Sequence, residues 1–326
     1  MADIRAIGRH AVRSAMTVCM AAAAIACDNA GILKPQSGGM PYSVVILAAD
    51  AETRQELATG LEAPVAGLPQ KEKSFDVTTT GDTALTQVTR YARCIVVARR
   101  GKGNKPTIKY ERDVYAKPQL LAYIELPPNN RPSESMKAVT GPLSRLINQF
   151  EINSETAALK RRHNPKGSKA VAEQTGCNIL IPADMQSMKR GNDFIWLSNN
   201  AASGMQSICV YTYTGCYRSP QTLTAKRDSV MKANIPGEKE GMYMHTSRQA
   251  AIYTKTINVN GQPATELRGL WEMTGDAMGG PFVCHAVTDT LHRRTIVAEA
   301  FVYAPGKTKR NLIRQIEAAL FTLRLP

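Results

Sequence analysis

The first half of the chain alternates apolar runs of strand length with stretches of helical periodicity. Residues 42–50 and 94–100 are apolar runs typical of buried strands, and helices are predicted over 51–59 and 83–92. Two extended runs within residues 107–128 follow, and we expect them to pair antiparallel. The pattern therefore predicts a lobe that begins with a β-α-β order.

A long amphipathic helix is predicted next, over residues 142–163. Its apolar stripe, at i, i+3, i+4 and i+7, consists of Leu143, Leu146, Ile147 and Phe150. Residues 160–163 are basic, which complements the negative end of the helix dipole, so helix capping explains this cluster without nucleic acid. Residues 164–170 are expected to separate an N-terminal α/β lobe (42–163) from a C-terminal α+β lobe (168–326).

The second half is predicted to be rich in strands. Its first elements are a helix over 168–175, strands over 177–182, 193–199 and 206–214, and a helix over 220–234. Asn260-Gly261, at the centre of the run 251–273, is the strongest hairpin signal in the chain. A second hairpin is expected within 279–305, and an amphipathic helix over 307–324 ends the chain. The fold class predicted from these elements is α+β, with two lobes of largely antiparallel sheet and amphipathic helices packed on one face.

The N-terminal stretch has the order of charges and apolar residues typical of an export signal. Arg5, Arg9 and Arg13 precede an apolar run over 15–26, about a dozen residues, whereas a membrane-spanning helix needs about 20. The run ends in the small residues Ala24-Ile25-Ala26, directly before Cys27.

This ending resembles the lipobox of bacterial lipoproteins. The resemblance implies a signal peptide over residues 1–26, cleavage after Ala26, and acylation of Cys27 with chains such as palmitate. Residues 27–41, which contain many turn-forming residues, then serve as a lipid-anchored tether. A secretory leader cut at the same bond, or a buried N-terminal helix, are the alternatives.

The net charge of the chain is +14, with 41 basic and 27 acidic residues. Removal of residues 1–26 takes away three arginines and one aspartate, which lowers the charge to +12. Basic proteins often bind nucleic acid, but export makes that partner unexpected, so anionic lipid or glycan is the better candidate partner. A solvated basic surface without such a partner is the alternative. The expected location is the cell envelope, at the periplasmic or outer-membrane face.

Five cysteines follow Cys27, and none of them is spaced as a CxxC pair. They are Cys94, Cys177, Cys209, Cys216 and Cys284. Because most lie in strand-like apolar runs, we expect buried free thiols rather than disulfides or metal ligands.

Several longer strings are similar to one uncharacterised family. They are LKPQSGGMPYSV (33–44), YERDVYAKPQ (110–119), GNDFIWLSNNAASG (191–204), AKRDSVMKANIPGEKEGMYM (225–244), RGLWEMTGDAMGGPFVCHAV (268–287) and FVYAPGKTKRNLIRQIEAALFTLRLP (301–326). This set, spread over nearly the whole mature chain, resembles a family of Bacteroidetes envelope lipoproteins known as domain of unknown function 4837. The resemblance implies a lipid-anchored, exported protein and brings no catalytic residues with it.

Standard nucleotide-binding, zinc-protease, serine-hydrolase and zinc-finger motifs are absent from the sequence, so no cofactor or metal is predicted. A hydrolase would have to use the carboxylates of Glu272, Asp276 and Glu299 together with His285. His285 and Glu299 are expected on the two strands of the second hairpin, and the hairpin register decides whether they share a face.

Two neighbouring features have structural explanations as well. In the strand before the glycine-rich loop 274–280, Trp271 is predicted to face the core, and Arg268 and Glu272 to face solvent. Trp196 lies beside the segment NNAASG (199–204), where an indole and amides could bind sugar, but core packing is the favoured interpretation.

The start of the last helix breaks the usual charge rule. Lys307, Lys309 and Arg310 lie where the helix dipole disfavours cations, which predicts a meeting with a phosphate or carboxylate, or else a solvated basic face. The sequence thus favours an exported, lipid-anchored protein with a non-catalytic role in binding or assembly, with an envelope hydrolase as the alternative.

Overall fold

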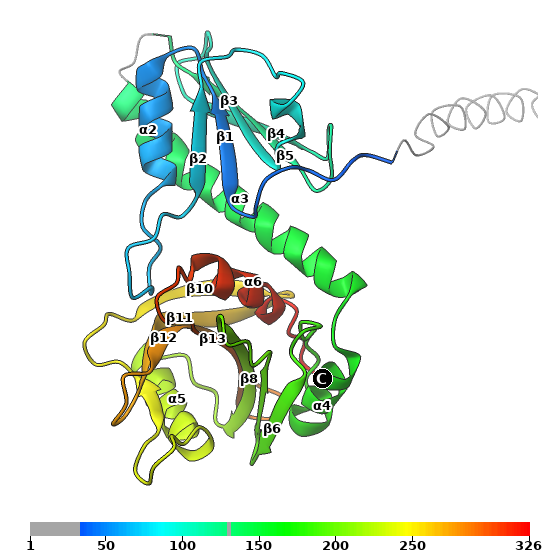
Figure 1. Cartoon of the computed structure of the whole chain (residues 1–326), viewed down its shortest axis with the longest axis vertical. Helices are drawn as coiled ribbons and strands as arrows, with labels where there is room; N and C mark the ends of the chain where they lie inside the picture. The colour runs from blue at the N-terminus through cyan, green and yellow to red at the C-terminus, as the bar shows by residue number, and fades with distance from the viewer. Residues whose placement is uncertain (1–32, 129–131) are drawn as a thin grey trace, which may run out of the picture.

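The computed structural model describes residues 33–128 and 132–326, which form two lobes joined by one long helix. Figure 1 shows the lobes one above the other, with helix α3 (Pro132–Arg161) running from the upper lobe down to the lower one. The predicted signal peptide and Cys27 lie outside the described residues.

The first lobe contains a five-stranded sheet in the order β2-β1-β3-β5-β4. Its strands are β1 (Ser43–Leu47), β2 (Asp76–Thr80), β3 (Cys94–Arg100), β4 (Thr107–Arg112) and β5 (Leu120–Leu126). The first four in this order run parallel, and β4 pairs antiparallel with β5, as predicted for the run 107–128. Parallel neighbours need crossover connections, and helix α2 (Ala51–Leu61) supplies one between β1 and β2.

Helices α2 and α3 cover one face of this sheet, and their apolar side chains fill the core between them. The predicted stripe of α3 is buried there, with Leu143 and Ile147 fully enclosed. The helix begins ten residues before the predicted start and contains Pro142. The helix predicted over 83–92 is wrong, because this segment contains only the short 3-10 turn Thr89–Tyr91.

The second lobe is built on an eight-stranded antiparallel sheet, which confirms the α+β class. Its path is β10-β11-β12-β13-β8-β7-β6, and β9 pairs with β11 beside it. The strands are β6 (Ser187–Gly191), β7 (Phe194–Ser198), β8 (Met205–Thr214), β9 (Met244–Thr246), β10 (Tyr253–Val259), β11 (Gln262–Met273), β12 (Gly279–Asp289) and β13 (Arg294–Tyr303). Asn260 and Gly261 both have positive φ in the turn between β10 and β11, as the hairpin signal predicted.

Helices cover both faces of the second sheet, where the sequence predicted one face. Helices α4 (Pro165–Thr175) and α6 (Arg310–Leu320) pack on one side, over Ile195, Ile296 and Ala298. Helix α5 (Pro220–Asn234) packs on the other. Residues 177–182, predicted as a strand, make only isolated bridges to residues 163 and 324.

The lobes meet where α6 lies beneath the first lobe and beside α3 (Figure 1). The Arg314 guanidinium of α6 lies 4.4 Å from the centre of the Tyr42 ring and donates to the carbonyl of Ser74 at 2.6 Å. Burial lowers the pKa of Arg314 to about 10. An arginine of the second lobe is thus enclosed by the first lobe.

The start of the described chain is attached to the first lobe. The amide of Lys117 donates to Pro35, and the amide of Gly38 donates to Tyr91. The expected tether, residues 27–41, is therefore held against the lobe over this part of its length.

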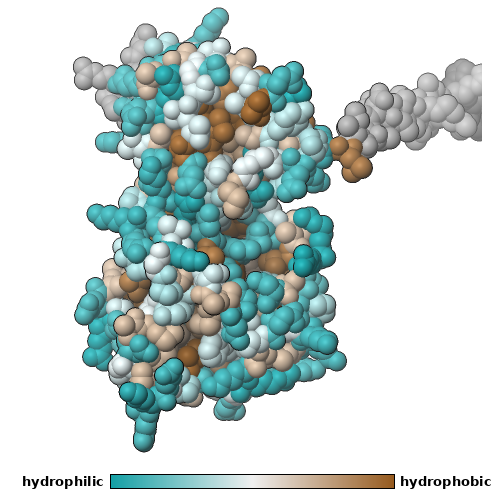
Figure 2. Space-filling view, viewed as in Figure 1, coloured by the Kyte–Doolittle hydropathy of each residue, from teal (hydrophilic) through white to brown (hydrophobic). Residues whose placement is uncertain are grey.

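Hydrophilic residues cover most of the visible surface of both lobes, with apolar patches between them (Figure 2). Among the helices of the described chain, none combines the length and the apolar character needed to cross a bilayer.

Candidate functional site

The four residues proposed for a hydrolase site lie at separate places in the second lobe. Glu299 and His285 are fully buried, Glu272 is partly exposed, and Asp276 lies in the exposed turn between β11 and β12. In the sheet, His285 is opposite Ala298 and Cys284 is opposite Glu299. Since opposite residues point to the same face, His285 and Glu299 lie on opposite faces of the sheet.

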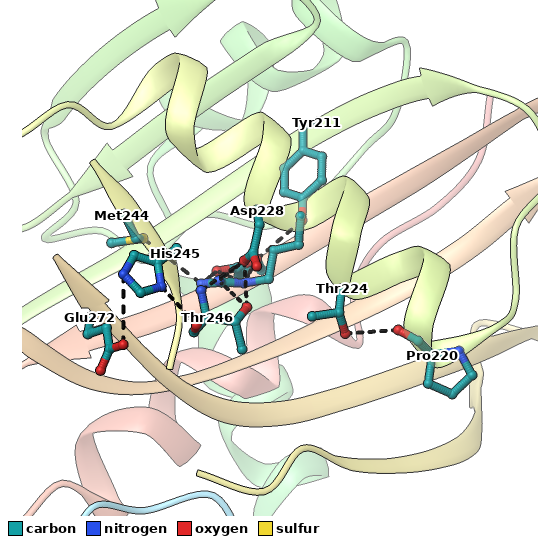
Figure 3. Close-up of polar contacts among 10 residues, drawn as sticks. Tyr211, Pro220, Thr224, Asp228, Met244, His245, Thr246 and Glu272 are labelled. Carbon is teal, nitrogen blue, oxygen red and sulfur yellow. Dashed lines mark hydrogen bonds and ion pairs between the residues drawn. The ribbon is translucent and has the colours of Figure 1, made fainter. Parts of the chain in front are cut away.

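Glu299 binds an arginine that the sequence did not single out. Both oxygens of its carboxylate accept from Arg227 of α5, with the closest pair, Nη2 and Oε1, 2.7 Å apart. The hydroxyl of Tyr211 donates to Glu299 at 3.2 Å. Burial raises the pKa of Glu299, and the charge of Arg227 opposes this shift. Figure 3 shows this network between α5 and the sheet.

The network continues from Arg227 toward the edge of the sheet. Arg227 donates to Thr246 of β9 at 2.9 Å, and both the amide and the hydroxyl of Thr246 donate to Asp228. Next to it, His245 Nε2 lies 3.7 Å from the carboxylate of Glu272 (Figure 3). Glu272 therefore has a histidine partner, but His245 rather than His285.

On the opposite face, His285 lies in a second buried cluster. Its Nε2 is 3.5 Å from Glu266 Oε2, and the edge of its ring contacts Phe321 at a centroid distance of 4.6 Å. Arg268, which we expected to face solvent, instead donates to Glu266 at 3.0 Å and to Glu317 of α6. Only 15% of the Arg268 side chain is exposed, because α6 covers this face.

This cluster contains three side chains with the right chemistry for a metal. Glu266, His285 and Glu317 offer donor atoms that all lie within 4.8 Å of one another. The guanidinium of Arg268 already binds both carboxylates and supplies the positive charge that a metal ion would otherwise bring to them. We therefore interpret the cluster as a buried ion-pair network that fixes α6 to the sheet.

The cationic start of the last helix meets carboxylates of the first lobe. Glu72 accepts from the amides of Lys309 and Arg310 at 2.7 and 2.9 Å, and the Arg310 side chain binds Asp76, with Nη1 and Oδ1 3.1 Å apart. Lys309 and Arg310 are buried, whereas Lys307 is exposed. Carboxylates of the first lobe of the same chain thus lie at the helix end where the sequence suggested a lipid or glycan anion, and that ligand stays a prediction.

A cavity in the first lobe lies at the carboxyl ends of β1 and β3, where parallel sheets commonly bind ligands. Its volume is about 350 Å³. The charged groups around it bind one another, Arg100 with Asp50 at 3.5 Å and Arg99 with Glu125 at 3.3 Å.

An apolar cavity of the second lobe lies at one end of its sheet, on the α5 side. It is about 280 Å³ in volume, and both tryptophans of the chain, Trp196 and Trp271, line it. The other lining residues are Met205, Ile235, Pro236, Gly237, Glu238, Met244, Met273, Asp276, Met278 and Phe301. We call it the tryptophan pocket. Trp271 is core, as predicted, while Trp196 is only partly buried.

The sequence singled out Glu299 and Arg268 as notable residues but did not predict the side chains that bind them. Arg227 looked like one of many basic residues, yet it is 1% exposed. The available signal was Glu299 itself, because a carboxylate within an apolar strand needs a buried cation. The pairing of Glu266 with Arg268 had an equally simple signal, since the two alternate on one face of β11.

Among the five described cysteines, four are buried thiols, as predicted, and none is in a disulfide. Cys216 is exposed and differs from that prediction. Burial raises the pKa of the Cys94, Cys209 and Cys284 thiols.

Comparison with known families divides the chain close to the lobe boundary. Residues 164–322 match the family described as domain of unknown function DUF4837, which confirms that part of the resemblance. The resemblance was expected to extend over nearly the whole mature chain, but residues 37–162 match a different family, domain of unknown function DUF8532.

A search of curated proteins finds no match. A crystal structure from Bacteroides thetaiotaomicron VPI-5482 is 8% identical, with a TM-score of 0.27. The match covers 46% of this chain and 45% of that one. A likeness this weak supports no statement about fold or function.

Proposed function

Residues 164–322 match the model of the DUF4837 family, whose role is not established, so we propose a function from the sequence and the site geometry. The protein is an exported lipoprotein of the cell envelope, anchored through acylated Cys27, with a non-catalytic role in binding or assembly. The lipobox-like ending before Cys27 supports the anchor.

One observation carries the non-catalytic part of this proposal. A hydrolase needs its acid, base and nucleophile around one cleft that water can enter. Glu299 and His285 are buried on opposite faces of a sheet, where Glu299 is bound by Arg227 and the His285 ring is enclosed beside Glu266 and Phe321. Within the described chain, Glu272 and Asp276 share no partner. This geometry supports structural roles for Glu299 and His285 and does not support the hydrolase alternative.

Anchoring is tested by growing cells with a palmitate analogue that carries a clickable alkyne. The wild-type chain should be labelled and should sediment with membranes, whereas Cys27→Ala should be unlabelled and remain unprocessed. Cys216→Ala is the matched control, because it also removes a thiol but should label normally. Native protein that retains Met1, or that carries no label, would contradict the anchor.

The absence of catalysis is tested separately with the purified protein and panels of chromogenic esters, phosphate esters and glycosides. We expect no turnover above that of buffer. Turnover that Glu272→Gln or Asp276→Asn abolishes would overturn the non-catalytic role, since both side chains are accessible and their amides should fold normally.

A further inference from the structure

The residues that line the tryptophan pocket are mostly apolar, and two of the exposed ones are acidic. Its walls are two indoles, the Phe301 ring and several methionines, and the ring centroids of Trp196 and Trp271 lie 6.0 and 5.6 Å from that of Phe301. Methionine side chains are flexible and polarisable, so such walls adapt to ligands of different shape.

The charged residues of the pocket are all acidic. Glu238 and Asp276 are exposed, come from the loops after α5 and β11, and have no basic partner within the described chain. Lysine and arginine are absent from the described residues that line the pocket, in a chain with 41 basic and 27 acidic residues. The local charge is therefore opposite to the net charge of the protein.

This combination selects one class of ligand. The hydroxyl groups of a sugar need polar partners on all sides, and thioethers, isoleucine and proline do not supply them. A fatty acid would place its carboxylate beside Glu238 and Asp276. An alkylammonium suits both the apolar lining and the acidic residues. Its chain fits the apolar walls, and its positive charge is attracted by the two carboxylates and the aromatic rings.

We propose that the tryptophan pocket binds a small alkylammonium compound, with the chain against Trp196 and Trp271 and the ammonium beside Glu238 and Asp276. This proposal rests on the proposed binding function and specifies the ligand class.

The pocket can be tested by fluorescence, because both tryptophans of the chain line it. Full-length Cys27→Ala is titrated without detergent with n-hexylammonium, n-hexanol and n-hexanoate, which share one chain and differ in head group. We expect a saturable change in tryptophan emission with each compound. The affinity for hexylammonium should be about fivefold higher than that for hexanol, and the affinity for hexanoate should be the lowest. The difference in affinity between hexylammonium and hexanol should shrink at about 0.5 M salt, because salt screens the attraction between exposed charges.

The double variant Glu238→Gln/Asp276→Asn should bind hexylammonium no more tightly than hexanol, with its hexanol affinity unchanged. Glu240→Gln, an exposed carboxylate of the same loop that does not line the pocket, should behave as the parent. Trp196→Phe should reduce the emission change and keep the binding order.

Absence of a saturable change with any of the three compounds would overturn the proposal. Equal affinities for hexylammonium and hexanol, or a preference unaffected by the double variant, would overturn it as well. Because the titration uses unacylated protein, its failure is distinct from a failure of the palmitate experiment.

Discussion

Arg227 binds both carboxylate oxygens of Glu299 in the interior of the second lobe, where the two side chains are 1% and 0% exposed. The pair joins helix α5 to strand β13, and Phe282 lies under the guanidinium at 3.8 Å from the ring centre. A buried pair of this kind costs much desolvation, so its removal has consequences that depend on which partner is removed.

Loss of one partner should be far worse than loss of both. Arg227→Met leaves a buried carboxylate without a cation and should lower the free energy of unfolding by about 3–5 kcal/mol. Arg227→Met/Glu299→Leu should be markedly more stable than Arg227→Met alone. Urea denaturation followed by circular dichroism measures both, and Arg190→Met, in an exposed pair with Glu173, should cost less than about 1 kcal/mol. A double variant as unstable as the sum of both single changes would contradict this.

The capping of α6 by Glu72 gives a second prediction. Glu72→Ala removes the acceptor for the amides of Lys309 and Arg310 and should lower stability by about 0.5–2 kcal/mol. Glu72→Gln keeps one acceptor oxygen and should therefore lose less stability than Glu72→Ala. Because the cap comes from the other lobe, limited proteolysis should also cut Glu72→Ala faster than wild type. Glu111→Ala, an exposed residue of β4, serves as the control for both measurements.

The cluster on the other sheet face predicts a loss of stability in acid. Burial alone would raise the pKa of Glu266, but the neighbouring His285 and the charges of Arg268 and Lys255 outweigh it and hold this pKa well below its usual range. An unfolded glutamate has a pKa of about 4.3, so Glu266 supplies stability above that pH and loses it as the pH falls toward the folded value.

The variant Glu266→Gln isolates this contribution. Urea midpoints measured from about pH 6 downward should fall less steeply for Glu266→Gln than for wild type below about pH 4.3, even though the variant is less stable at neutral pH. Glu125→Gln, in an exposed pair with Arg99, should keep the wild-type slope. Parallel curves for wild type and Glu266→Gln would show that Glu266 is not held ionised by its partners.

Thiol reactivity should single out Cys216. It is exposed, whereas the other four described thiols are buried, and burial raises the pKa of each of them. Brief treatment of folded protein with a maleimide, followed by peptide mapping, should label Cys216 and leave Cys94, Cys177, Cys209 and Cys284 unlabelled among the described cysteines. Labelling of those four should require urea. Equal labelling of Cys209 and Cys216 without denaturant would contradict the buried state.

Local chemistry explains the parts of the fold that could be predicted. Asn260-Gly261 forms its turn because both residues tolerate positive φ, and this depends on no distant contact. The stripes around Leu143 and Ile316 are buried because helical periodicity places their apolar residues on one side. The α+β class followed from these elements.

The errors occur where a segment depends on its neighbours. Residues 177–182 are apolar but not a strand, since their β-type pairing in the described chain is limited to isolated bridges with residues 163 and 324. The sequence of residues 83–92 has the apolar spacing of a helix, but the segment does not form one. Leu85 and Ala92 pack instead against a small apolar cluster on the sheet face away from α2 and α3. Periodicity alone does not distinguish these cases.

The amino-acid sequence alone therefore determined which residues form most strands, helices and turns, because these depend on backbone geometry and side-chain spacing within a few residues. Tertiary structure decided the partners. Glu299 meets Arg227 from 72 positions away, and Glu72 meets Lys309 from 237 positions away. His285 and Glu299 lie on opposite faces because the β12–β13 register places His285 opposite Ala298. A one-residue shift would reverse that outcome, and only the packing of both sheet faces against their helices fixes it.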